Sequence, residues 1–294
     1  MIKIYKNDSL SVEEIMARDT TKVDVSKIVS DIIENVRKNG DKALFEYCEK
    51  FDGGAPDSLL VSKEEIDDAL ENTDPALLAA MTEARDNIRA FHEKQVRQGF
   101  VMTEKEGVVL GQKITPIEKV GLYVPGGTAS YPSTVLMDAI PAKIAGCSEI
   151  VMTTPAKNGV VSPAILAAAS LAGVDKIYKV GGAGAVAALA YGTETVVKVD
   201  KIVGPGNAFV AEAKRQVFGI VGIDMIAGPS EILIIADGKA NPRFVAADML
   251  SQAEHDKIAT AVLVTDSEEL AENVSAELER QIPLLPRAEI ARTS

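Results

Sequence analysis

The chain has 294 residues, of which 47% are hydrophobic and 25% charged, and a formal net charge of −12. This length exceeds the usual size of one hydrophobic core, so we expect two domains of a soluble globular protein. No cluster of lysine and arginine stands out against the negative charge, so a nucleic-acid partner is not expected. A membrane partner is not expected either, because the most apolar stretch, AILAAASLAGV, is too short to span a bilayer.

The N-terminus lacks the apolar segment of a signal peptide. The two cysteines, Cys48 and Cys147, lie far apart and have no metal or redox spacing. We therefore expect reduced thiols and a cytoplasmic location.

The first hundred residues show mainly helical spacing. Residues 25–54 predict helix with a break at Asn39–Gly40. Ser62 is a good cap for the next helix, and Asp74–Pro75 opens another in the usual order of cap residue and proline. The short β-type runs of residues 107–124 then predict the start of a parallel sheet.

From there, apolar strands alternate with helices. The predicted strands lie within 119–125, 149–155, 176–182, 199–207, 231–237 and 259–265, and helices follow them at 133–146, 162–173, 183–192, 208–219, 241–255 and 267–282. This alternation predicts an α/β fold with parallel sheets that are covered on both faces. The last residues, 283–294, follow a helix where the pattern requires another strand. They indicate an interrupted domain or, alternatively, a flexible tail.

Three glycine-rich turns follow predicted strands, at Val124–Thr128, Val180–Ala185 and Val203–Phe209. Glycine lets a backbone approach a ligand closely, and helix N-termini present unpaired N–H groups to anions. None of the turns is a full G-x-G-x-x-G motif, and each alone is ordinary in a strand-to-helix connection. Together they favour a polar or phosphate-bearing ligand at the carboxyl ends of the strands. A fourth turn places Ser230 before a strand, where it either binds substrate or closes the turn.

One of only two histidines lies in the segment LSQAEHD. Asn241 and Pro242 predict the start of a helix that reaches about His255, with Asp248, Gln252 and His255 on one face. Gln252 and His255 offer one oxygen and one nitrogen, which is half of a four-ligand zinc site. The alternative is a solvated helix end whose histidine favours the negative end of the helix dipole.

The other histidine, His92, is expected to face solvent or a subunit boundary on a helix. There is no G-x-S-x-G elbow and no G-x-x-x-x-G-K-[ST] loop. A serine hydrolase and a P-loop nucleotidase therefore find no support.

Several long segments together resemble the bacterial histidinol dehydrogenases. They extend over most of residues 115–256 and are GLYVPGGTASYPSTVLMDAIPAKIAGC, VGGAGAVAALAYGTETVVKVDKIVGPGNAFVAEAKRQV, DMIAGPSEILIIAD and VAADMLSQAEHD. The resemblance implies a zinc-dependent enzyme of histidine biosynthesis. It oxidises L-histidinol to L-histidine through the aldehyde, with two NAD used in succession.

The resemblance also implies roles for five residues. Gln252 and His255 match the family residues that bind zinc and touch substrate, and Ser230 matches a substrate contact. Tyr123 and Asn207 match NAD contacts.

Two departures from the family stand out. Gly184 occupies a position where some members have a glutamine that contacts NAD. The family sequence also continues beyond the position of Ser294, and that later part supplies a Glu–His acid/base pair and two further zinc ligands. We therefore expect a C-terminally truncated chain that contains no catalytic acid or base, binds zinc weakly and is inactive alone.

The resemblance implies two Rossmann-like lobes and a helical N-terminal region. The expected divisions are an N-terminal arm (1–20), a discontinuous zinc and substrate lobe (21–120 with 230–294) and an NAD-binding lobe (121–229). Family members are homodimers that share residues between their sites, and whether this chain dimerises stays open. Two alternatives also stay open: a non-catalytic folded module that binds nucleotide or a partner, and an NAD-linked oxidation of another amino alcohol.

Overall fold

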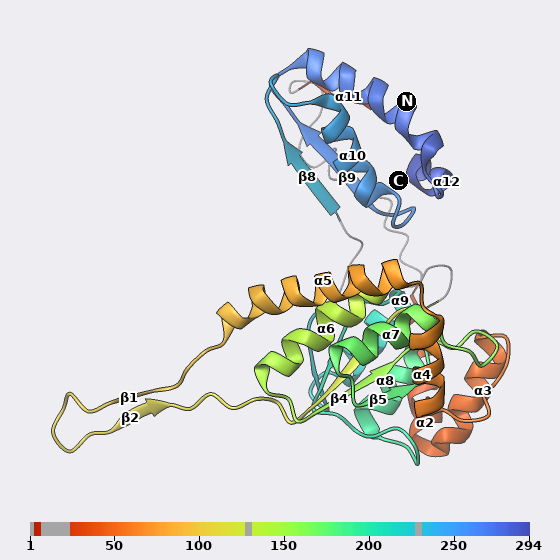
Figure 1. Ribbon diagram of the computed structural model, residues 1–294, viewed down its shortest axis with the longest axis vertical. Coiled ribbons are helices and arrows are strands. Elements are labelled where there is room, and N and C mark those ends of the chain that lie inside the picture. Colours follow the sequence, from red (N-terminus) through yellow and green to blue (C-terminus); the bar gives the residue numbers. More distant parts are fainter. Residues whose placement is uncertain (1–2, 7–23, 127–130, 227–230) are drawn as a thin grey trace. The chain divides into compact units, whose positions relative to one another are not determined.

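The computed structural model describes residues 3–6, 24–126, 131–226 and 231–294. The chain divides into two compact units, a larger one of residues 23–227 and a smaller one of residues 1–22 and 228–294 (Figure 1). In the larger unit the helices are α2 (Ser26–Asn39), α3 (Asp41–Phe51), α4 (Lys63–Asn72), α5 (Pro75–His92), the 3₁₀ turn η1 (Glu93–Gln95), α6 (Pro132–Ala145), α7 (Pro163–Ala172), α8 (Gly182–Tyr191) and α9 (Ala208–Val217). Its strands are β1 (Phe100–Met102), β2 (Leu110–Gln112), β3 (Lys119–Tyr123), β4 (Glu149–Thr153), β5 (Lys176–Tyr178), β6 (Lys201–Val203) and β7 (Gly222–Ile223).

The centre of the larger unit is a five-stranded parallel sheet in the order β5-β4-β3-β6-β7. Helices α2, α3, α8 and α9 build one hydrophobic core against it, and α4 to α7 build a second. Successive side chains of β3 point to opposite faces of the sheet and so enter different cores: Leu122 belongs to the second core and Tyr123 to the first. The larger unit is therefore a doubly wound α/β domain, which confirms the predicted fold class.

The predicted helix boundaries follow from local chemistry. Gly40 has φ +52° and separates α2 from α3. Ser62 and Glu65 form a reciprocal capping box at the start of α4. Asp74 caps α5, with its Oδ1 accepting from Ala76 N at 2.7 Å.

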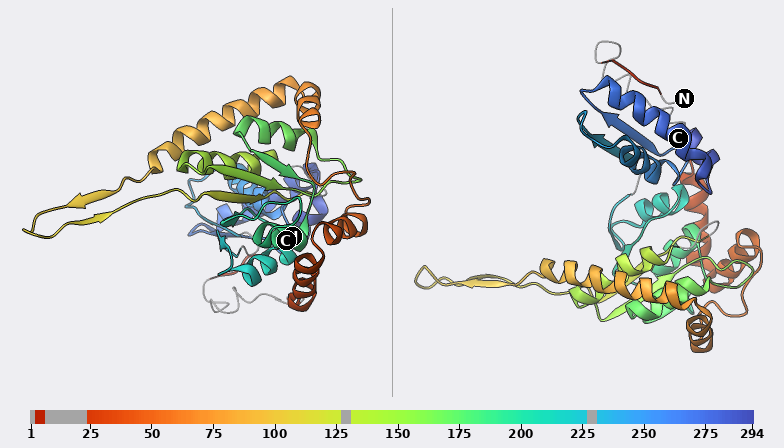
Figure 2. Two further views of the ribbon diagram at one scale, coloured as in Figure 1. Left: turned by 90° about the horizontal axis from the view of Figure 1, so that it is seen from below. Right: turned by 45° about the horizontal axis from the view of Figure 1, so that its top comes forward.

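The region before the sheet differs from the prediction. Residues 110–112 do not begin the parallel sheet but pair antiparallel with residues 100–102, and the sheet starts only at Lys119. The resulting ribbon, β1–β2, extends away from the rest of the larger unit (Figure 2). Both strands are exposed, so their apolar residues were no guide to a buried sheet.

The smaller unit holds a two-stranded parallel sheet, β8 (Glu231–Ile235) and β9 (Thr260–Val264). Its helices are α10 (Pro242–Ala253), α11 (Glu268–Gln281), the turn η2 (Ile282–Leu284) and α12 (Ala288–Thr293). Helices α10 to α12 form a third core with the inward residues of the two strands.

The division of the chain differs from the expected one. Residues 21–120 were expected to join residues 230–294 in one discontinuous lobe, but α2 to α5 belong to the larger unit, where they pack on helices that flank its sheet. Their apolar faces are covered by helices of that unit: α2 packs on α8, α4 on α7 and α5 on α6. Helical spacing predicts that a face is buried, and it does not say against which sheet.

Candidate functional site

The strand order of the larger unit reverses between β3 and β6. The chain proceeds from β3 outward through β4 to β5, then returns to place β6 on the other side of β3. In doubly wound sheets, ligands bind at the carboxyl ends of the strands beside such a reversal. Tyr123 ends β3 and the segment Gly204–Asn207 follows β6, so the structure brings both predicted cofactor contacts to this point.

The loop Gly204–Asn207 requires glycine at two positions. Gly204 has φ +115°, and a Cβ there would lie 2.1 Å from Tyr123 O, a backbone atom that cannot move aside. A Cβ on Gly206 would lie 2.4 Å from Val210 Cγ1. Close packing thus fixes the loop directly beside the end of β3.

Asn207 is exposed and caps α9. Its Oδ1 accepts hydrogen bonds from Phe209 N at 3.0 Å and Val210 N at 3.2 Å. The cap fixes the rotation of the amide, and within the described part of the chain the Nδ2 group has no partner. Asn207 therefore presents an oriented donor at the strand reversal.

Tyr123 is only 4% exposed. Its hydroxyl accepts a hydrogen bond from Gly182 N, the first residue of α8, at 3.1 Å. Burial raises the pKa of Tyr123, and the nearby Asp52 carboxylate raises it further. The hydroxyl consequently stays protonated and keeps one O–H to donate.

A buried lysine of α9 holds the loop Gly204–Asn207 by a hydrogen bond, and its role was not predicted from the sequence. Lys214 of α9 is 2% exposed and donates from Nζ to Gly204 O at 2.9 Å. It also forms an ion pair with Asp224, which accepts from Gly204 N at 2.9 Å. Both backbone polar groups of Gly204 are thereby held. The available signal was a lysine inside the apolar stripe of α9, beside Val210 and Val217.

Gly184, the position that departs from the family pattern, is buried in α8. A Cβ there would lie 3.2 Å from Tyr47 Cδ2 and 3.6 Å from Leu44 Cδ2, both from α3. The tyrosine ring of α3 thus packs closely over the glycine.

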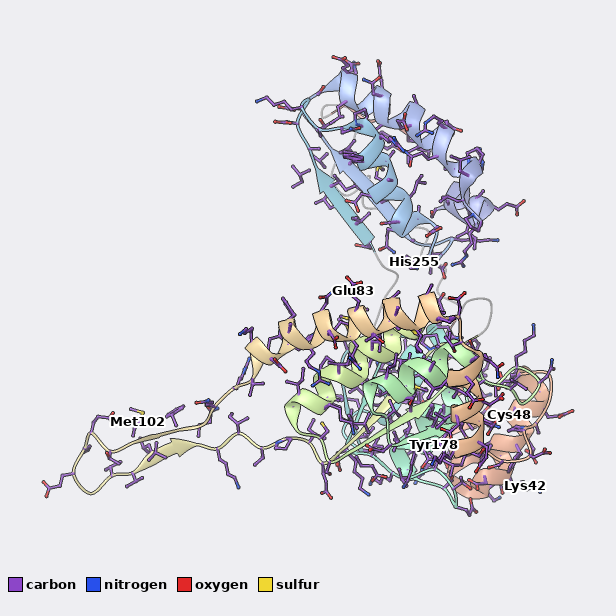
Figure 3. All side chains as sticks on the ribbon, viewed as in Figure 1. Lys42, Cys48, Glu83, Met102, Tyr178 and His255 are labelled. Atoms are coloured by element: carbon purple, nitrogen blue, oxygen red, sulfur yellow. The ribbon has the colours of Figure 1, made fainter. Side chains whose placement is uncertain are left out.

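Gln252 and His255 lie at the end of α10 in the smaller unit. The helix ends at Ala253, two residues before the predicted end, and His255 occupies a turn in which its N–H donates to Gln252 O at 3.1 Å. His255 is exposed (Figure 3). Gln252 Nε2 is buried and has no hydrogen-bond partner among the described residues. Such an atom is costly unless a ligand or a rotated amide satisfies it.

The described residues contain no group of three or more His, Cys, Asp and Glu placed to hold a metal. An amide oxygen and an imidazole nitrogen are both groups that zinc accepts, so the assignment of Gln252 and His255 as two of its four ligands stays a prediction from side-chain chemistry. Ser230 lies outside the described residues. His92 ends α5, and its Nδ1 lies 2.7 Å from Gln95 Oε1, which leaves it no evident role.

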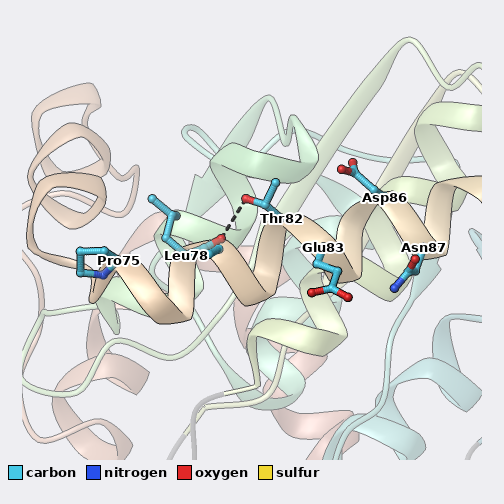
Figure 4. Close-up of a pocket in the computed structure, with 7 residues that line it drawn as sticks. Pro75, Leu78, Thr82, Glu83, Asp86 and Asn87 are labelled. Atoms are coloured by element: carbon cyan, nitrogen blue, oxygen red, sulfur yellow. Dashed lines mark hydrogen bonds between the residues drawn. The ribbon is translucent and has the colours of Figure 1, made fainter.

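A shallow groove of about 570 Å³ runs along α5 (Figure 4). All the residues that line it come from that helix, among them Leu78, Thr82, Glu83 and Asp86. The Thr82 hydroxyl is already bonded to Leu78 O at 2.8 Å. The groove therefore offers no converging groups from a second element. No helix in the described part of the chain has the length and apolarity to cross a membrane.

Comparison with known proteins agrees with the doubly wound class. The histidinol dehydrogenase family profile matches residues 16–294. The histidinol dehydrogenase of Bacillus cereus is 54% identical over 293 residues, covering all of this chain and 66% of the relative. That of Listeria innocua is 56% identical over 268 residues, covering 91% of this chain and 63% of the relative. The crystal structure of histidinol dehydrogenase from Elizabethkingia anophelis superposes with a TM-score of 0.89 at 43% identity, covering 92% of this chain and 63% of that one.

The chain belongs to the histidinol dehydrogenase family. It spans about two thirds of the length of the relatives it matches.

Proposed function

We propose that the chain belongs to an enzyme of histidine biosynthesis that oxidises L-histidinol to L-histidine through the aldehyde, with NAD as oxidant and zinc at the substrate. Family membership is the observation that carries this proposal. The meeting of Tyr123 and Asn207 at the strand reversal supports it independently, since ligands of doubly wound sheets bind there.

The proposed cofactor contacts follow from the donors at this point. Asn207 Nδ2 would donate to NAD while its Oδ1 keeps capping α9. The Tyr123 hydroxyl would donate its proton to NAD while its oxygen accepts the hydrogen bond from Gly182 N. Lys214 and Asp224 hold Gly204 and so position the loop. NAD, when bound, supplies the acceptor for hydride.

The proposed substrate groups are Ser230, Gln252 and His255. Gln252 and His255 would hold the metal, and the buried unpaired amide of Gln252 supports a ligand at this position. Zinc, when bound, supplies a Lewis acid that polarises the alcohol oxygen. Two ligands are half of a four-ligand set, so we propose that these 294 residues bind zinc weakly and turn over little histidinol alone.

The test is histidinol-dependent formation of NADH. We expect little from the 294-residue chain and robust turnover, with two NADH per histidinol, from a chimera that carries the remaining third of the Bacillus cereus relative. Substituting His255→Ala should abolish that turnover, whereas His92→Ala, the matched control at the other histidine, should leave it intact. NADH formation that persists in His255→Ala, or that does not depend on histidinol, would refute the proposal. Other amino alcohols in the same assay test the alternative substrate.

A second candidate is a non-catalytic module that binds nucleotide. It is favoured by one observation: the strand-reversal groups all lie in the larger unit, separate from Gln252 and His255 in the smaller one. This candidate predicts that NAD binds and that no extension of the chain produces NADH.

We also propose that the protein forms homodimers through the β1–β2 ribbon. Phe100, Val101 and Leu110 are 53%, 71% and 60% exposed, and an isolated two-stranded ribbon is at best marginally stable in water. The turn of the ribbon carries Glu104 and Glu106 around one lysine, and its base carries Arg97 and Lys113. If two ribbons pair antiparallel about a two-fold axis, the acidic turn of each ribbon lies against the positively charged base of the other.

A further inference from the structure

A buried carboxylate lies beside the loop Gly204–Asn207 and takes no part in the proposed function. Asp138 of α6 points its Oδ2 atom at Gly204, where a Cβ would lie 3.1 Å from it. That oxygen is buried and has no hydrogen-bond partner within the described ranges. A buried carboxylate oxygen without a donor is strongly unfavourable when the group is ionised.

The surroundings of Asp138 make ionisation harder still. Two charged groups act on it: Asp224, which follows β7, and Lys214, from α9. Lys214 is already engaged by Asp224 and by Gly204 O. The ammonium of Lys214 therefore pairs with the half-buried Asp224, and it acts on the buried Asp138 only through its charge. Burial first, and then the Asp224 charge, raise the pKa of Asp138 to about 7, while Lys214 opposes them.

We propose that Asp138 is a positioning residue for the loop Gly204–Asn207, which it stabilises when it carries a proton and loosens when it loses it. Helices α6 and α9 belong to opposite faces of the sheet, so Asp138 and Lys214 approach Gly204 from two sides, and Lys214 bonds to it. The protonated carboxyl is neutral and does not repel the Asp224 carboxylate, which holds Gly204 N. The ionised carboxyl competes with Asp224 for Lys214, the contact that holds Gly204.

The direction of the pH effect follows from the raised pKa. In the unfolded chain Asp138 ionises near the ordinary aspartate value, so between that value and about pH 7 the folded state binds the extra proton. Stability from this group is thus greatest in acid and falls as the pH rises through about 7. The expected effect of pH on NAD affinity rests on the proposed function. If only the protonated form holds the loop, the competent fraction falls about tenfold between about pH 6 and about pH 8, and the apparent Kd rises about tenfold.

The experiment compares wild type, Asp138→Asn and Asp57→Asn at both pH values. Asp138→Asn keeps the size of a neutral carboxyl, and Asp57 is an exposed aspartate remote from this loop in the sequence, so its variant controls for net charge. We expect calorimetric Tm to drop from about pH 6 to about pH 8 in wild type and Asp57→Asn, and markedly less in Asp138→Asn. Equal pH dependence in all three overturns the inference.

Two further readouts separate this inference from the proposed function. NAD affinity should weaken about tenfold with pH in wild type and stay constant in Asp138→Asn. If NAD does not bind at any pH, the proposed function fails, while the Tm comparison still decides the role of Asp138. If Asp138→Asn does not fold, the infrared carbonyl band of a buried protonated carboxyl in wild type decides it. That band must disappear between about pH 6 and about pH 8, and its absence at the lower pH overturns the inference.

Discussion

At the scale of single residues, Gly204 is the position that most constrains the loop between β6 and α9. Both of its backbone polar groups are held by Asp224 and Lys214, and its φ of +115° excludes ordinary side chains. Gly204→Ala must therefore combine backbone strain with a clash against Tyr123 O.

Gly219 provides the matched control, because it has φ +97° and open space around the Cβ position. We expect the free energy of unfolding to fall by about 1 kcal/mol in Gly219→Ala, from strain alone, and by at least about 3 kcal/mol in Gly204→Ala. Denaturant unfolding followed by circular dichroism measures both. Equal losses would mean that the loop relaxes away from β3 without cost.

Sequence reasoning at this scale found groups with local signatures. The caps at Ser62, Asp74 and Asn241 follow from residue type and position, and the structure places them where the pattern indicated. Lys214 and Asp138 were missed, because a charge within a helix reads as solvated unless the packing of another helix against it is known. The burial of Gly184 under Tyr47 was invisible for the same reason.

At the scale of elements, the β1–β2 ribbon carries the sharpest prediction. If two copies of the chain dimerise through this ribbon, replacing its apolar residues with charged ones must disrupt the dimer. We expect the double variant Val101→Lys and Leu110→Lys to be monomeric in analytical ultracentrifugation at concentrations where wild type is dimeric. Lys105→Gln, an exposed change in the turn, should leave the dimer intact. A monomeric wild type, or a dimeric double variant, would show that the ribbon serves no such contact.

The elements themselves were largely predictable, and the ribbon shows where prediction stopped. The strands and helices predicted from Lys119 onward appear in the expected order, because continuous apolar runs and caps are local features. Strand β7 was not predicted, and residues 283–294 hold the helix α12, which packs in the third core and is not a flexible tail. The segment of residues 107–124 contains equally apolar residues, yet part of it forms an exposed antiparallel pair. Whether an apolar run is buried depends on what covers it, which is not encoded locally.

At the scale of the whole molecule, the sequence predicted two units but not their membership. Helices α2 to α5 belong with the five-stranded sheet, so residues 23–227 form one unit with two cores. The groups at the strand reversal therefore lie within a single compact unit. Gln252 and His255 lie in the other unit, in the last turn of α10 and in the turn that follows it.

The most direct test of the central claim is NAD binding by wild type and Asn207→Asp, measured by calorimetric titration. Aspartate keeps the oxygen that caps α9, and it replaces only the Nδ2 donor. The account predicts one NAD per chain in wild type, and affinity at least about tenfold weaker in the variant with Tm unchanged, since a lost hydrogen bond and a misplaced charge each cost about 1 kcal/mol or more. Absence of NAD binding in wild type, or equal affinity in the variant, would contradict a nucleotide site between β3 and β6.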